Sequence, residues 1–141
     1  MPEQATPDEE AVLAVNEAFY RAFATRDFAA MDAVWASETP VACIHPGWDA
    51  LVGRDMVMES WAAILGGAGA PQIRCEAPRA FVLGSSAFVI CREVLEPGRL
   101  IATNVFAREQ AGWRMVHHQA GPGGQAQPAP QSTKRPPGPL H

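Results

Sequence analysis

The chain has 141 residues and a formal net charge of −4 at pH 7, and 48% of its residues are hydrophobic. This length suits one domain with its own core, and the acidic balance gives no electrostatic basis for binding nucleic acid or an anionic membrane. No apolar run approaches the roughly 20 residues of a membrane-spanning helix, and the polar start does not resemble a signal peptide. We therefore expect a cytoplasmic protein whose three cysteines stay free as thiols.

The first half of the chain predicts three helices. A capping-box motif begins at Thr6, and apolar residues then recur at helical spacing to about residue 25. Asp27 can cap a second, shorter helix. Gly53 precedes a third helix, which the glycine pair 66–67 ends because glycine suits the left-handed cap position.

Extended segments dominate the second half. Residues 41–45 predict a short strand before the third helix, and residues 72–83 predict a longer strand after it. Pro78 interrupts the longer strand, so we expect an edge position or a bulge there. Three further strands are predicted at residues 87–95, 100–108 and 113–119.

The last part of the chain differs in character from the rest. From residue 121 onward it is rich in Pro, Gly and Gln and has almost no apolar residues. Such a segment cannot bury enough surface to offset the entropy of ordering it. We predict one domain over residues 1–120, followed by a disordered tail over residues 121–141.

A turn at residues 97–98 joins the two longest strands into a hairpin, because proline presets φ and glycine accepts positive φ. A two-residue loop there fixes the register and places alternate residues on one face of the sheet. The resulting pairs are Glu93 with Ala102, Cys91 with Asn104, and Val89 with Phe106.

The next turn leaves two registers open. If residues 110–111 form the loop, Asn104 faces His117. A three-residue loop with a bulge at Gly112 shifts the register by one residue and brings His118 to that position instead. One histidine of the pair therefore points inward and the other points outward.

With residues 110–111 as the loop, the two faces of the sheet differ. One face mixes apolar and polar side chains, as a ligand pocket does; it carries Cys91, Glu93, Asn104, Phe106, Trp113, Met115, His117 and Gln119. The other face is aliphatic, and we expect it to pack against a second copy of the chain; it carries Ile90, Val94, Ile101, Thr103, Val105 and Val116.

Three segments make the chain similar to SnoaL-like members of the NTF2-like superfamily. They are the helical opening with Phe19, Tyr20 and Phe23, the segment at residues 45–54, and the closing strand at residues 112–119. The resemblance covers roughly residues 8–120. It implies an α+β cone in which three N-terminal helices pack on a curved antiparallel sheet, and usually a dimer. Members include isomerases, cyclases, dehydratases, hydrolases and proteins without known activity.

Three residues are the candidates for catalysis. His117 (or His118) can move protons, because histidine titrates near working pH. Glu93 has a raised pKa if it faces the pocket, and it can then act as a general base. The resemblance places Asn104 near the pocket acid of the isomerases, where an amide can donate to a developing oxyanion.

The remaining candidates are expected to contact the ligand. His45 and Trp48 flank a turn at the expected mouth of the cone. We expect no cofactor and no metal, because Cys43 and His45 share a strand face but lack the spacing of a metal site. The other predicted ligand-binding residues are Cys91, Phe106, Met115, Gln119, Phe19 and Trp61.

Together these features predict a protein that binds a small apolar or amphipathic molecule in a partly polar pocket. The first hypothesis is an isomerase, lyase or hydrolase that uses acid–base chemistry on an apolar, carbonyl-bearing compound. The alternative is a non-catalytic module for ligand binding or dimerisation. In both cases the expected partners are a small molecule and, through the sheet, a second copy of the chain, without nucleic acid or membrane.

Overall fold

A computed structural model of the chain describes residues 4–69 and 71–123. The first half contains helices α1 (Pro7–Thr25) and α2 (Phe28–Val34), the short strands β1 (Ala42–Ile44) and β2 (Leu51–Val52), and helix α3 (Arg54–Gly66). The second half contains the long strands β3 (Arg74–Leu83), β4 (Ser86–Leu95), β5 (Gly98–Glu109) and β6 (Gly112–Pro122). All of these strands join one sheet of order β2-β1-β6-β5-β4-β3.

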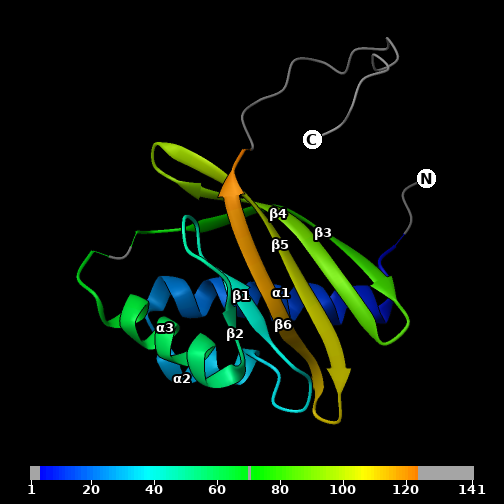
Figure 1. Ribbon diagram of the computed structural model, residues 1–141. Coiled ribbons are helices and arrows are strands. Elements are labelled where there is room, and N and C mark those ends of the chain that lie inside the picture. Colours follow the sequence, from blue (N-terminus) through cyan, green and yellow to red (C-terminus); the bar gives the residue numbers. More distant parts are fainter. Residues whose placement is uncertain (1–3, 70, 124–141) are drawn as a thin grey trace, which may run out of the picture.

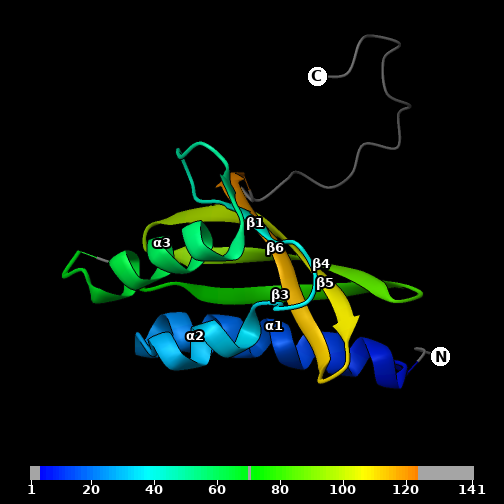
Figure 2. The same ribbon diagram turned by 60° about the horizontal axis from the view of Figure 1, so that its bottom comes forward.

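The helices lie on one side of this sheet. Helix α1 runs along the sheet and contacts β3, β4 and β6, while α2 packs on α1 (Figures 1 and 2). Helix α3 contacts α2 and the short strands β1 and β2 at one end of the sheet (Figure 1). The predicted α+β architecture of three helices on a curved sheet is confirmed.

Local capping explains where the first two helices begin. The Thr6 hydroxyl accepts a 3.1 Å hydrogen bond from the Glu9 backbone N–H, and the Glu9 carboxylate accepts one of 2.8 Å from the Thr6 N–H. This reciprocal pair satisfies two backbone donors that a helix leaves free at its start. The Asp27 carboxylate caps α2 by accepting from the Ala30 N–H at 3.0 Å. Both predicted caps are present.

Arg54 fixes the position of α3 relative to α2. Its guanidinium donates to the backbone carbonyls of Asp32, Trp35 and Ala36 at 2.9–3.1 Å, and to the Asp32 carboxylate at 2.8 Å. The carbonyls at the end of a helix have no partner within the helix, so this side chain satisfies them from outside. Gly53, at a φ of +98°, turns the chain into α3 immediately before Arg54.

The short strands make the sheet more mixed than the sequence predicts. Strand β1 pairs parallel with β6, with Ala42 opposite His117, and antiparallel with β2. The expectation of a wholly antiparallel sheet is therefore wrong at this one pair. Strand β2 has only two residues, which is too short to show the alternation that marks a strand in a sequence.

Strand β3 has the irregularity that Pro78 predicts. The register between β3 and β4 shifts between Glu76 and Arg79, and Ala77 takes a φ of +55°. Proline cannot donate to a neighbouring strand, so a bulge in an edge strand accommodates it. The sheet order places β3 at the edge, so both expected features occur together.

The hairpin of β4 and β5 turns one residue earlier than predicted. Leu95 pairs with Gly98, so residues 96–97 form the loop and Gly98 already belongs to β5. Cys91 then lies opposite Ala102, and Val89 lies opposite Asn104, which makes the predicted pairs wrong. Each partner has moved by two residues, and an even shift leaves every side chain on its predicted face.

The turn between β5 and β6 is the predicted loop at residues 110–111. Glu109 pairs with Gly112, and Phe106 pairs with Met115. Up to this point the register agrees with the first of the two alternatives. No bulge occurs at Gly112, although its φ of +125° requires glycine.

A register shift further along β6 exchanges the two histidines. It falls between Val105 and Phe106 of β5, so that β6 carries one extra residue before His117. Asn104 consequently pairs with His118, while His117 and Gln119 belong to the opposite face. The predicted inward positions of His117 and Gln119 are wrong, because a shift of one residue reverses the face of every later side chain.

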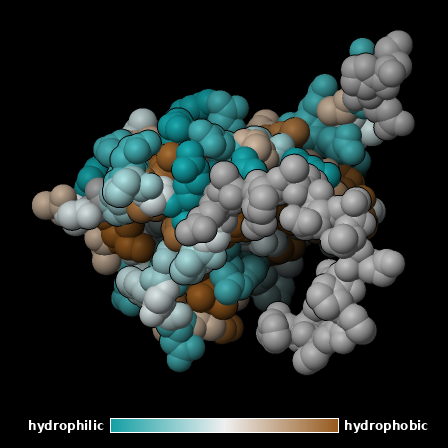
Figure 3. Space-filling model, turned by 90° about the horizontal axis from the view of Figure 1, so that it is seen from above, coloured by the Kyte–Doolittle hydropathy of each residue, from teal (hydrophilic) through white to brown (hydrophobic). Residues whose placement is uncertain are grey.

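The side of the sheet away from the helices carries apolar side chains with Arg79, Arg92 and Thr103 between them. We call it the outer face and define it by Phe81, Phe88, Ile90, Ile101 and Val105. The Phe81 and Phe88 rings stack at 4.8 Å, and Ile90 is 38% exposed. Seen from above, hydrophobic residues reach the surface in several separate places among hydrophilic ones (Figure 3).

Strand β6 continues to Pro122, three residues beyond its predicted end. Residues 124–141 lie outside the described residues, so the predicted disordered tail stays a prediction. Among residues 4–69 and 71–123, no helix is long and apolar enough to cross a membrane.

Candidate functional site

A cavity of about 360 Å³ opens between α1, α3 and the inner side of the sheet. We call it the site cavity. Its volume lies at the lower end of the roughly 300–1,000 Å³ that ligand pockets occupy. Three of its lining residues are titratable: His45, Glu93 and His118. The others are Phe23, Pro46, Trp48, Trp61, Ile64, Pro71, Ile73, Leu95 and Leu100.

Glu93 projects from β4 into this apolar surrounding and is only 2% exposed. The Tyr20 hydroxyl of α1 donates a 2.6 Å hydrogen bond to its Oε2 atom. Burial raises the pKa of Glu93, and the Tyr20 hydrogen bond opposes this rise in part. A carboxylate with a raised pKa is a stronger base than an ordinary one, which suits it to proton transfer.

Asn104 orients His118 from behind the cavity. Its amide nitrogen donates to Asn16 Oδ1 at 2.8 Å and to the Tyr20 hydroxyl at 3.2 Å. The remaining oxygen of Asn104 lies 2.6 Å from His118 Nδ1, so this network assigns the hydrogen to Nδ1. His118 Nε2 then presents its lone pair 3.8 Å from Glu93 Oε2. Burial lowers the pKa of His118 to about 3, which keeps the imidazole neutral.

His45 occupies the opposite side of the site cavity. Ser60 Oγ donates to the Val57 carbonyl at 2.7 Å, so its hydroxyl is free to accept from His45 Nε2 at 2.9 Å. Burial lowers the pKa of His45 to about 4, so this ring is also neutral at pH 7. The Trp48 ring packs against His45 at 4.7 Å and is 48% exposed, which places it at the mouth.

Trp61 lines the site cavity and carries a donor without a partner. Its ring packs edge-on against Phe19, Phe23 and His45 at 4.8–5.6 Å. Among the described residues, its buried indole N–H has no hydrogen-bond acceptor, and the same holds for Trp35. An unpaired buried donor costs about 1–3 kcal/mol. An oxygen atom of a bound molecule would offset this cost at Trp61.

The structure brings four of the predicted site residues to the cavity: Glu93, His45, Trp48 and Trp61. Asn104 and Cys91 are buried behind it, and both N–H donors of the Asn104 amide are already used by protein acceptors. Asn104 therefore positions its neighbours and does not present a donor to a ligand. Three predicted residues are fully buried in the core: Phe19, Phe106 and Met115.

The two remaining predicted residues lie away from the cavity. His117 is half-buried, and its Nδ1 atom lies 2.9 Å from the Ala42 carbonyl of β1. Gln119 is exposed on the same side of β6. His118, the other candidate that the two possible registers left open, is the histidine that points inward.

Sequence analysis did not select Tyr20 and Asn16 as site residues. They lie four residues apart on α1, so they share one helix face, and both are buried among apolar neighbours. Two polar residues within an apolar stripe were a signal that could have identified them, because buried polar groups need partners. Ile73 and Leu100 of the cavity wall have no comparable signal.

The described residues contain no group of three His, Cys, Asp or Glu side chains placed to hold a metal ion. Cys43 and His45 do lie together, with Sγ 3.8 Å from Nε2. Burial raises the pKa of Cys43 to about 12, so this sulfur stays a neutral thiol.

The profile of the SnoaL-like domain matches residues 12–122, so the chain belongs to the SnoaL-like family. Two solved structures are similar to this chain over nearly their whole length. One, from Streptomyces avermitilis, is described as a "putative dehydratase from the NTF2-like family"; it has a TM-score of 0.77 and 33% identity, over 85% of this chain and 100% of that one. The predicted membership of the NTF2-like superfamily is thereby confirmed.

The second structure, from Thiobacillus denitrificans, is described as a "putative calcium/calmodulin-dependent protein kinase type II association domain". It has a TM-score of 0.69 and 37% identity, over 86% of this chain and 98% of that one. Among curated proteins, F-box protein SKIP8 of Arabidopsis thaliana is 28% identical over 112 residues, which are 78% of this chain and 48% of that protein. The chain thus spans about half the length of this relative.

Proposed function

We propose that the site cavity binds a small apolar molecule bearing a carbonyl group, and that Glu93 transfers a proton at the carbon next to that carbonyl. The observation that carries this proposal is the buried Glu93 carboxyl in a largely apolar cavity, held by Tyr20 at 2.6 Å. Burial raises the pKa of this carboxyl, which matches its basicity to weakly acidic C–H groups. The apolar walls supply the binding energy, and the polar groups orient the ligand.

In the proposed reaction, a Glu93 oxygen takes the proton, the C–H bond breaks, and the electron pair moves to the carbonyl oxygen. The unpartnered Trp61 N–H is the proposed donor to that oxygen. Returning the proton to another carbon gives an isomerisation. In a dehydration, the enolate electrons instead form a carbon–carbon double bond, the C–O bond on the next carbon breaks, and the hydroxyl leaves as water with the proton that Glu93 holds. The 33% identical neighbour described as a putative dehydratase supports the second outcome.

His118 contributes a neutral ring beside the carboxyl. An imidazolium 3.8 Å from Glu93 would favour the carboxylate and lower its pKa. Because burial keeps His118 uncharged, the base retains its strength. Asn104 and Tyr20 act as positioning residues, one for the ring and one for the carboxyl.

The test uses α-tetralone, an apolar bicyclic ketone, in D₂O. We expect the protein to accelerate deuterium incorporation at the carbon next to the carbonyl, followed by NMR. The Glu93→Gln variant should reduce the accelerated rate at least 100-fold, since proton transfer by a side chain contributes about 10²–10⁴. The control His117→Gln, on the opposite face of β6, should keep it. Equal rates in wild type and Glu93→Gln would refute the proton-transfer role.

A second candidate function is self-association, and the apolar outer face favours it. Its five residues lie on β3, β4 and β5, with Arg79, Arg92 and Thr103 between them, on the side of the sheet opposite helix α1 (Figure 1). The 37% identical neighbour is described as an association domain, which supports the same reading. We propose that two copies of the chain pack through this face, with or without catalysis in the cavity.

A further inference from the structure

Cys75 and Cys91 lie side by side on the inner side of the sheet. Cys75 of β3 pairs with Glu93 of β4, and Cys91 precedes Glu93 by two residues. Side chains alternate along a strand, so Cys91 shares a face with Glu93 and is the diagonal neighbour of Cys75. The β3 bulge begins immediately after Glu76, next to this pair.

Both thiols contact α1. The Asn16 amide donates to Cys75 Sγ at 3.7 Å, and the Tyr20 hydroxyl lies 3.4 Å from Cys91 Sγ. The proximity of the two thiols raises the pKa of Cys75 and lowers the pKa of Cys91. Cys91 is therefore the better nucleophile of the pair, because the thiolate is the reactive form.

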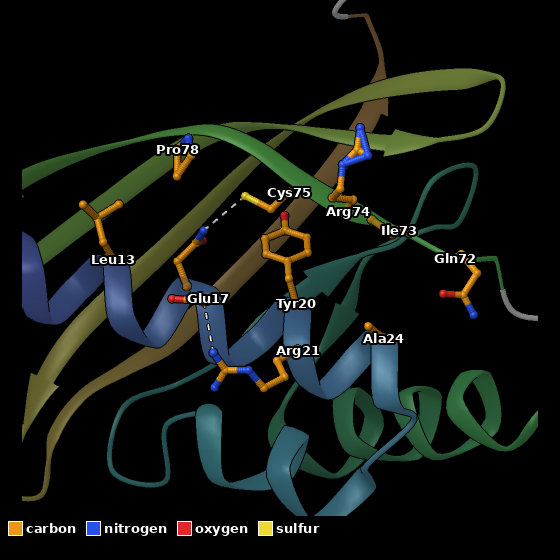
Figure 4. Close-up of a pocket in the computed structure, with 11 residues that line it drawn as sticks. Leu13, Glu17, Tyr20, Arg21, Ala24, Gln72, Ile73, Arg74, Cys75 and Pro78 are labelled. Atoms are coloured by element: carbon orange, nitrogen blue, oxygen red, sulfur yellow. Dashed lines mark hydrogen bonds and ion pairs between the residues drawn. The ribbon is translucent and has the colours of Figure 1, made fainter.

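A second cavity leads to this pair. It measures about 570 Å³ and lies between α1 and β3, so we call it the α1–β3 cavity. Cys75, Asn16 and Tyr20 contribute to its wall, and Figure 4 shows Cys75 pointing from β3 toward α1. Cys91 is only 2% exposed. A small reagent can thus enter beside Cys75, whereas a large one cannot reach Cys91.

We propose that Cys75 and Cys91 form an oxidisable dithiol, which a hydroperoxide entering through the α1–β3 cavity converts to an intrachain disulfide. The thiolate of one cysteine attacks a peroxide oxygen: an S–O bond forms, the O–O bond breaks, and the leaving hydroxide or alkoxide takes up a proton. The sulfur of the other cysteine then attacks the oxidised sulfur: the S–S bond forms, the S–O bond breaks, and water leaves with the proton of the second thiol. The two thiols together lose two electrons, and the hydroperoxide gains them.

Closing this bond requires only a small movement of the backbone. Diagonal neighbours on a sheet have Cα atoms about 7–8 Å apart, whereas a disulfide spans about 4.4–6.8 Å. Strand β3 is an edge strand and carries a bulge next to Cys75, so it can shift without breaking pairs on a second side.

Cys43 provides a matched control within the same chain. It is fully buried on β1, and its polar neighbour is His45. Burial raises the pKa of Cys43 to about 12, so a thiolate does not form there near neutral pH. Oxidation governed by exposure alone would modify the partly exposed Cys75 without linking it to the buried Cys91.

The experiment treats the fully reduced, full-length protein with hydrogen peroxide, blocks remaining thiols with N-ethylmaleimide, and maps tryptic peptides by mass spectrometry. Cleavage after arginine places the three cysteines in separate peptides, at residues 27–54, 75–79 and 80–92. We expect the two later peptides to appear linked, with two thiols lost from each chain. Cys43→Ser should form the same link to the same extent, and neither Cys75→Ser nor Cys91→Ser should form it.

Oxidation of the protein unfolded in urea serves as the reference for a chain without positioned thiols. In the unfolded protein, peptide 27–54 should also form disulfides with the other two peptides. A folded protein that links peptide 27–54 as readily, that links two chains, or that keeps three free thiols would overturn the proposal.

Discussion

His118 Nδ1 lies 2.6 Å from Asn104 Oδ1, and a single extra residue in β6 creates this contact. Without the register shift, Asn104 would face His117, and His118 would lie on the outside of the sheet. The shift brings a neutral imidazole next to Glu93 and leaves His117 against β1. The identity of the histidine in the site is therefore set by an irregularity of the strand.

Stability should fall in acid because two histidines are buried without charge. Burial lowers the pKa of His118 to about 3 and of His45 to about 4, below the ordinary value of about 6.5. The unfolded chain then binds more protons than the folded chain as the pH falls below about 6.5. We expect His118→Gln, whose amide can still donate to Asn104, to reduce the slope of unfolding free energy by about 1 kcal/mol per pH unit between pH 6 and 4.5.

The measurement is urea denaturation at a series of pH values. The control is Thr103→Ala, which changes a half-buried residue without a titratable group and should keep the wild-type acid slope. Glu93 acts in the opposite sense: its raised folded pKa destabilises the protein as the pH rises, so it partly masks the histidine effect in wild type. An unchanged slope in His118→Gln would show that this ring is already protonated in the folded state.

Asn104→Ala should destabilise the protein by about 2–4 kcal/mol in urea denaturation at pH 7, since it leaves two buried partners unpaired, the Asn16 carbonyl and the His118 N–H. It also removes one of the hydrogen bonds of the Tyr20 hydroxyl, which keeps its bond to Glu93. The neighbouring Thr103→Ala, half-buried on the opposite face, should stay within about 1 kcal/mol of wild type. Equal effects of the two variants would contradict the central position of Asn104 in the network.

The parts of this structure that sequence analysis predicts correctly depend on local patterns. Thr6 and Asp27 mark helix starts by their own side chains, and alternation alone puts Glu93 and Asn104 on one face. This assignment of faces is correct although the turn lies at residues 96–97, one residue earlier than predicted, because the register differs from the predicted one by an even number of residues. It fails for His117, where the bulge adds one residue and neither glycine nor proline marks the position.

Contacts between distant segments account for what the sequence did not predict in the site. Tyr20 and Glu93 are separated by 73 positions, and their hydrogen bond depends on how α1 lies over β4. Likewise, Phe23, Ile73 and Leu100 meet at one cavity only after the sheet has curved. The periodicity of the sequence does not predict such contacts between distant segments. A buried polar pair such as Asn16 and Tyr20, in contrast, indicates that hydrogen-bond partners must lie nearby.

The unpartnered indole of Trp61 predicts a selective loss of ligand affinity. Trp61→Phe keeps an aromatic ring but removes the N–H, so the affinity for α-tetralone should fall roughly 10-fold, the equivalent of one hydrogen bond. The affinity for tetralin, which lacks the carbonyl, should not fall by this factor. Binding can be followed by isothermal titration calorimetry.

Trp35→Phe is the matched control for this prediction. Trp35 is also buried with an unpartnered N–H, but it does not line the site cavity. Its replacement should leave the affinities for both molecules within twofold of wild type. If Trp61→Phe and Trp35→Phe behave alike, or if tetralin loses as much affinity as α-tetralone, the indole is not the donor to the carbonyl.

Ile90→Glu should dissociate a dimer that packs through the outer face. Ile90 lies near the middle of that face, opposite Arg79 of β3, and burying a carboxylate there between two copies costs several kcal/mol that an ion pair with Arg79 offsets only in part. We expect sedimentation equilibrium to show at least a 100-fold weaker dimer, about 3 kcal/mol, while circular dichroism stays unchanged. The control Met56→Glu adds the same charge at an exposed position of α3, away from the sheet, and should sediment as wild type. A dimer that tolerates Ile90→Glu but not Met56→Glu would place the interface on the helices. A wild-type protein that sediments as a monomer would refute the proposed dimer.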